Sequence, residues 1–122
     1  MKDVFEAILA YYNADVTLSG LAPLCRYRAD NEARPYVVIH LTSGDGVYDS
    51  ASYDILEKPY IQFSIWADTA AEADAILDAL TSRFDNATLT YSGSFCLRQN
   101  VVGDVDEESV WYYHVDYLID NQ

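Results

Sequence analysis

The chain has 122 residues, of which 51% are hydrophobic, and a formal net charge of −13. This is the usual size of one domain with its own core, and the acidic balance argues against direct binding of nucleic acid, which requires clustered Lys and Arg. It contains neither eighteen consecutive apolar residues nor a signal-peptide pattern, so we expect a soluble protein that is made in a cytoplasm and does not contact a membrane.

Two segments are predicted to form amphipathic helices. The first begins at Asp3 and Glu6, and the second begins at Thr69 and Glu72; both pairs have the spacing of a capping box. Apolar residues recur at three- and four-residue steps in both segments, which predicts one buried face on each helix. These residues are Phe5, Ile8, Leu9 and Tyr12 in the first helix, and Ala73, Ile76, Leu77, Leu80 and Phe84 in the second.

Alternation of apolar residues predicts four main strands, at 36–42, 60–67, 95–102 and 109–119, with minor strands near 24–28 and 88–91. We therefore expect a single α+β domain over residues 1–122. Its element order is αββαββ, and its two helices pack on one face of an antiparallel sheet of four or more strands. Leu18, Leu21 and Leu24, which precede the first main strand, are expected to lie under the sheet.

Residues 43–59 join the first two main strands and are too many for a tight hairpin. We interpret them as an extended loop or hairpin arm, in which Tyr48, Tyr53 and Leu56 contact another subunit. Tyrosine suits this role because its rigid apolar ring carries a polar tip. Two alternatives remain open, namely that residues 53–56 extend the following strand and that the loop folds back on its own subunit.

Charge is distributed unevenly along the chain. Residues 1–34 carry four bases and five acids, whereas residues 69–122 carry two bases and ten acids. Arg26, Arg28 and Arg34 are therefore expected to form a basic patch on an acidic molecule, and such polarity suits head-to-tail contacts between copies. An ordinary solvated surface is the alternative interpretation.

Four carboxylates gather in the turn that joins the last two strands. The turn lacks the glycine and the ligand spacing of a calcium-binding EF-hand loop, so we interpret it as a solvated hairpin tip that faces a partner or a channel. The residues are Asp104, Asp106, Glu107 and Glu108.

The sequence offers little for catalysis. His40, His114 and Asp116 are the only candidate site, and they lack the H-x-H or H-E-x-x-H spacing of a metal centre. Cys25 and Cys96 stand outside any C-x-x-C motif and are interpreted as structural thiols. We therefore predict that the protein is not an enzyme and that it uses no cofactor or metal.

Several features together carry a family resemblance. They are the short N-terminal helix, the segment Arg34-Pro35-Tyr36-Val37-Val38-Ile39, the long connection, the strand Tyr60-Ile61-Gln62-Phe63-Ser64-Ile65-Trp66-Ala67, the alanine-rich helix and the closing strand around His114. In this combination the chain resembles the tail-completion, or tail-terminator, proteins of long-tailed bacteriophages. The sequence departs from that pattern in being unusually acidic and rich in tyrosine.

The resemblance implies a non-enzymatic structural protein of the virion that assembles in the host cytoplasm. Such a protein forms a hexameric ring at the head-proximal end of the tail, ends growth of the tail tube, and joins the tail tube protein to the head connector. DNA passes through the ring without specific binding, and carboxylates that face the channel would repel its phosphates. The alternative function is an acidic DNA mimic that inhibits a nucleic-acid-binding protein.

Overall fold

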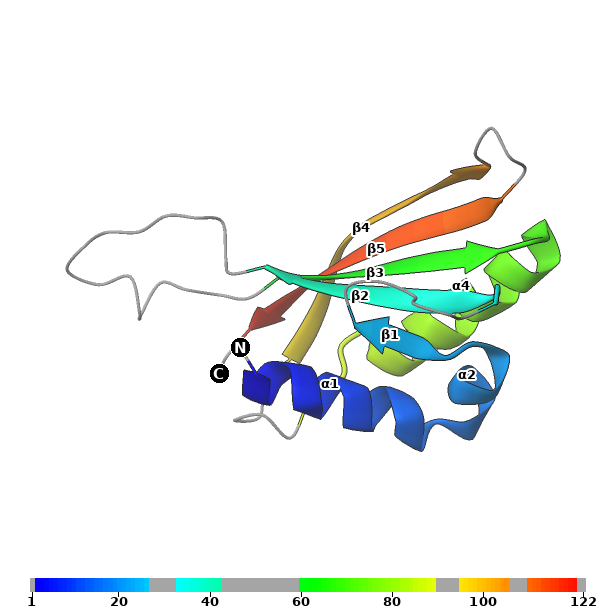
Figure 1. Ribbon diagram of the computed structural model, residues 1–122. Coiled ribbons are helices and arrows are strands. Elements are labelled where there is room, and N and C mark those ends of the chain that lie inside the picture. The colour runs from blue at the N-terminus through cyan, green and yellow to red at the C-terminus, as the bar shows by residue number, and fades with distance from the viewer. Residues whose placement is uncertain (1, 27–32, 43–59, 90–94, 106–109, 121–122) are drawn as a thin grey trace.

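The computed structural model describes residues 2–26, 33–42, 60–89, 95–105 and 110–120. These residues form one five-stranded sheet with the strand order β1-β2-β3-β5-β4, and the helices lie on one side of it (Figure 1). The elements are α1 (Lys2–Ala14), α2 (Val16–Leu21), β1 (Leu24–Arg26), β2 (Tyr36–Thr42), β3 (Tyr60–Ala67), α4 (Ala70–Phe84), β4 (Phe95–Val105) and β5 (Trp111–Asp120). None of the helices in this described part of the chain is long and apolar enough to cross a membrane.

The predicted α+β class is confirmed, but the sheet is mixed rather than antiparallel. Strands β2, β3, β5 and β4 pair antiparallel, whereas β1 pairs parallel with β2, with Leu24 opposite Val37. The backbone N–H of Val37 also donates to the carbonyl of Pro23 at 2.9 Å, which extends this contact beyond the strand. The connection between these two parallel strands is short, with nine residues, 27–35.

The described residues contain one helix more than the two predicted there. The additional helix, α2, has only six residues, and its N-cap is Asp15, whose carboxylate accepts from the backbone N–H groups of Thr17 and Leu18 at 3.0 Å each. Leu18 is buried in the core as expected, but the expectation for Leu21 is wrong, because this side chain lies on the outer side of α2 and is 39% exposed.

A cluster of aromatic rings around Phe84 joins the helices to the sheet. Ring centroids lie 4.9 Å from Phe84 at Phe63 of β3, 6.1 Å at Tyr117 of β5 and 5.3 Å at Tyr11 of α1. Tyr12 is also fully buried, and its hydroxyl donates to the carbonyl of Ala22 at 2.8 Å. These rings therefore fix α1 and α4 on the same face of β3 and β5.

The start of α4 has half of the predicted capping box. The hydroxyl of Thr69 accepts from the backbone N–H of Glu72 at 3.2 Å, as predicted. The carboxylate of Glu72 accepts from the N–H of Asp68 at 3.3 Å rather than from that of Thr69. Near the other end of the helix, the guanidinium of Arg83 donates to the carbonyl of Tyr11 at 2.9 and 3.1 Å, which ties α4 to the last turn of α1.

We expect Phe84→Ala to lower the free energy of unfolding by about 3–5 kcal/mol, because it removes a fully buried ring and leaves a cavity between α4 and the sheet. This loss is comparable to the whole net stability of a small domain. Urea unfolding followed by circular dichroism measures it, with the exposed Ser82→Ala as the control on the same helix. A loss below about 1 kcal/mol would contradict the central place of Phe84 in the core.

Candidate functional site

The sheet face opposite the helices carries two hydrogen-bonded pairs that link β3 to β5. The side-chain amide of Gln62 donates to a carboxylate oxygen of Asp116 at 3.0 Å. One step along the strands, the hydroxyl of Ser64 lies 2.9 Å from Nδ1 of His114. Both pairs join residues that are directly opposite in the sheet register, so they act as cross-strand ties.

An aromatic cluster continues this row of ties. The ring centroids of Trp66 and Tyr112, which are opposite one another on β3 and β5, lie 5.4 Å apart. His114 lies 5.0 Å from Tyr112 and 5.9 Å from Trp66. All three rings are half-buried, so the cluster presents both apolar faces and polar edges.

A serine hydroxyl beside an imidazole is the pair that forms an activated nucleophile in many enzymes. The surroundings of Ser64 and His114, however, do not form a catalytic site. Ser64 is only 3% exposed, which denies a substrate access to the hydroxyl. Asp116, which could orient the imidazole, instead accepts from Gln62. The pair is therefore a structural contact that the sequence could not reveal, because residues 64 and 114 come together only through strand pairing.

The two histidines of the candidate metal site lie on strands that do not adjoin. His40 is opposite Gln62 across the β2–β3 pairing, whereas His114 is opposite Ser64 across the β3–β5 pairing, so β3 runs between them. Within the described ranges no group of three or more His, Cys, Asp and Glu side chains is arranged to hold a metal ion. This arrangement gives no support to a metal centre at His40, His114 and Asp116.

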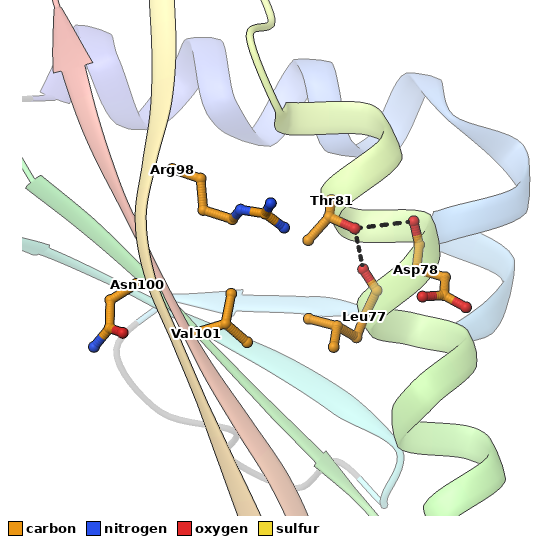
Figure 2. A pocket seen from close by; sticks show the side chains of 6 residues that line it. All are labelled: Leu77, Asp78, Thr81, Arg98, Asn100 and Val101. Carbon is orange, nitrogen blue, oxygen red and sulfur yellow. Dashed lines mark hydrogen bonds between the residues drawn. The ribbon is translucent and has the colours of Figure 1, made fainter.

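A groove of about 520 Å³ runs between α4 and the outer strand β4 (Figure 2). Leu77 of α4 and Val101 of β4 point toward one another across it, and Thr81 and Arg98 face one another beside them. The hydroxyl of Thr81 donates back to the carbonyls of Leu77 at 2.9 Å and Asp78 at 3.3 Å, so this wall presents a methyl group as well as an oxygen. The groove therefore has an apolar centre between polar ends.

Two tyrosines of β5 hold α4 in place on either side of this groove. The hydroxyl of Tyr113 donates to Asp74 in the first half of α4, and the hydroxyl of Tyr117 donates to Asp85 directly after its end, both at 2.6 Å. Hydrogen bonding to Asp74 raises the pKa of Tyr113, and burial together with Asp85 raises the pKa of Tyr117. Both hydroxyls thus stay protonated donors, and the groove residues of α4 lie between these two anchors.

The strand wall of the groove is fixed by two further contacts. Asp85 pairs with the guanidinium of Arg98 at 3.3 Å, which connects the end of α4 to β4. At the other end of β4, Gly103 lies opposite Tyr113, and a side chain at Gly103 would collide with the Tyr113 ring. Glycine is therefore required at this position for the ring to cross β4 and reach α4.

Two of the three basic residues predicted from the sequence, Arg26 and Arg34, lie within the described ranges. Arg26 is exposed at the end of β1 and lies opposite Ile39. Arg34 precedes β2, and its guanidinium pairs with Asp68 at 2.7 Å; this hydrogen bond raises the pKa of Arg34. Arg34 therefore has a counterion within its own chain.

Most other predicted site residues lie outside the described residues. Asp104 belongs to β4, opposite Tyr112 on β5, which places it near the end of the last hairpin. The sequence did not predict the groove. The adjacent valines Val101 and Val102 beside Gly103 are, however, an unusual composition for an outer strand. The predicted residues beyond the described ranges are Arg28, Tyr48, Tyr53, Leu56, Asp106, Glu107 and Glu108.

We expect His114 to titrate below its ordinary pKa of 6.5, because burial disfavours the imidazolium and the nearby His40 adds to this effect. The unfolded chain then binds more protons at this residue than the native protein does. Its contribution to stability is therefore fully present above the unfolded-state pKa of about 6.5, and it is lost as the pH falls from that value through the lower pKa of the folded protein.

Two-dimensional NMR of the imidazole protons measures the midpoint directly. His114→Gln should also flatten the decline in unfolding free energy between about pH 7 and pH 5.5. A midpoint at or above 6.5 would show that the contact with Asp116, and not burial, controls this imidazole.

Comparison with known proteins identifies the fold. No protein-family model matches the sequence, and no curated protein does. A chain in the virion of a native gene transfer agent particle matches with a TM-score of 0.67 and 14% sequence identity, over 95% of this chain and 93% of that chain. The bacteriophage SPP1 gp17 protein matches with a TM-score of 0.61 and 17% identity, over 98% of this chain and 91% of that chain. The resemblance to bacteriophage tail-completion proteins is therefore confirmed at the level of the fold, which this chain shares with a gene transfer agent virion protein and a protein of bacteriophage SPP1.

Proposed function

We propose that this chain is a non-enzymatic structural protein of a phage virion. It forms a hexameric ring at the head-proximal end of the tail, where it ends growth of the tail tube and joins the tube to the head connector. The observation that carries this proposal is the shared fold, which extends over 95% and 98% of the chain in the two comparisons. One of these chains belongs to a virion and the other is a bacteriophage protein.

The sheet has a shape that suits a ring. Within the described residues, β1 and β4 are the outer strands at opposite ends of the sheet, and the outer side of β4 bonds to the backbone of residues 86 and 87 at Cys96. A closed ring needs a heterologous contact, in which one surface of a copy meets a different surface of the next. Two unlike ends on one chain meet that requirement.

The charge of the chain is compatible with a conduit for DNA. A net charge of −13 gives the DNA phosphates no general attraction to the ring. We assign the acidic turn, Asp104 with Asp106, Glu107 and Glu108, to the channel or to the surface that faces the connector. We assign Arg26, Arg28 and Arg34 to contacts between subunits, where opposite charges guide association.

The purified protein is expected to form closed rings that coexist with monomers in a concentration-dependent equilibrium. Sedimentation velocity gives the stoichiometry, and negative-stain electron microscopy shows whether the particles close around a central hole. Rings added to polymerising tail tube protein should stop elongation at the capped end. A chain that stays monomeric at every concentration, or that binds a DNA-binding protein in a salt-sensitive way, would favour the DNA-mimic alternative instead.

We also assign residues 43–59 to the contacts between subunits of the ring. We expect the double variant Tyr48→Ser with Tyr53→Ser to weaken ring formation about tenfold or more, because interface tyrosines contribute mainly through their apolar rings. The matched control is Tyr48→Phe with Tyr53→Phe, which keeps the rings and should keep assembly. Equal assembly by the serine and phenylalanine variants, measured by sedimentation, would remove these tyrosines from the interface.

A further inference from the structure

Helix α2 presents an exposed face without charge. In a helix with 100° between residues, positions 16, 17, 20 and 21 fall on one side, and all four are exposed. Val16 is 82% exposed and Leu21 39% exposed, while an added side chain at Gly20 would meet no atom within 4 Å. We call this surface the α2 face; it consists of Val16, Thr17, Gly20 and Leu21.

The groove between α4 and β4 is a concave counterpart with similar chemistry. Its centre is formed by Leu77 and Val101, and Val101 remains 37% exposed although it belongs to the core-facing side of β4. Natural proteins usually protect an outer strand with charge or proline; β4 carries Arg98 and Asp104, yet it also exposes valines at 101, 102 and 105. An outer strand of this kind is typical of a surface that another chain covers.

The two surfaces lie at opposite ends of the sheet. Helix α2 leads directly into β1, the outer strand at one end of the sheet, and β4 is the outer strand at the other end (Figure 1). The groove is lined by residues of α4 and β4. Each surface has one acidic and one basic residue beside it, in the groove lining or along the chain. Asp78 and Arg98 line the groove, and Asp15 and Arg26 stand before and after the α2 face in the chain.

We propose that the α4–β4 groove of one copy binds the α2 face of the next copy in the ring. This inference rests on the proposed function and names the contact through which the ring closes. The occupant is a second copy because the same chain carries a convex uncharged face and an apolar groove at opposite ends, which generates a head-to-tail series. Each copy then covers one neighbour's groove and offers its own groove to the other neighbour.

Gly20→Gln gives the sharpest test, because the monomer has open space at this position. Glutamine also favours helix more than glycine does, so the unfolding free energy should not fall. The new side chain would nevertheless obstruct the α2 face. We expect ring association to weaken about tenfold or more in sedimentation, with no loss in the thermal unfolding midpoint.

Val101→Asp tests the groove from the other side, with Val102→Asp as its matched control. The two valines are neighbours on β4 and both are exposed, but Val101 faces α4 whereas Val102, which is 50% exposed, lies on the opposite face of the sheet. Val101→Asp should abolish rings, and Val102→Asp should retain them. Equal loss in both variants would show a general effect of charge on β4 and would overturn the proposal.

Mixing two defective variants tests the head-to-tail geometry. Val16→Asp destroys the α2 face and keeps the groove, whereas Val101→Asp destroys the groove and keeps the α2 face. Each variant alone should be monomeric, but an equimolar mixture retains one intact contact and should form one-to-one dimers that do not grow further. Absence of these dimers would overturn the proposed pairing.

The outcomes separate this inference from the proposed function. Wild-type rings together with full assembly of Gly20→Gln and Val101→Asp would overturn the contact and leave the ring in place. Variants that form normal rings but fail to stop the tail tube would assign the groove to the tube protein, which also overturns the contact. A wild-type protein that never forms rings would overturn both.

Discussion

The packing of Phe84 between helix and sheet is the constraint on which the remaining arrangement depends. Its ring contacts Phe63 and Tyr117, and so it fixes the end of α4 over the central strands β3 and β5. The next residue, Asp85, accepts from the Tyr117 hydroxyl and pairs with Arg98 of β4. Because α4 is centred on β3 and β5, it leaves β4 uncovered beside it, and the groove is the result of this offset.

Much of the framework could be predicted because its signals are local. The alternation in 60–67 and the three- and four-residue steps in 70–84 are confirmed by β3 and α4. Helix α2 was missed because six residues that include Gly20 have little helical propensity, and its stability comes from the Asp15 cap and the burial of Leu18. The parallel pairing of β1 depends on a partner twelve or more residues away, which periodicity does not specify.

The candidate site was less predictable, since it depends on contacts between distant residues. Counting charges indicated a basic patch at Arg34, but its carboxylate partner, Asp68, is 34 residues away. The same holds for the tie between Ser64 and His114, which strand register creates. The groove has no sequence signature because its walls, α4 and β4, are brought side by side only by their common packing against β5. Leu77, predicted as a core residue, is half-buried for this reason and forms part of the groove.

Self-association of such an acidic chain places a physical condition on the contact that holds the copies together. Copies that each carry a net charge of −13 repel one another at long range, and salt limits this repulsion to about 8 Å at physiological ionic strength. A stable contact must therefore gain its energy at short range, through burial of apolar surface that contains little charge. The α2 face and the centre of the α4–β4 groove have this composition, whereas the exposed side of α4 carries Asp74 and Asp78. Uncharged centres with flanking charges of both signs allow acidic copies to associate in one orientation, because charge then selects the partner surface without supplying most of the binding energy.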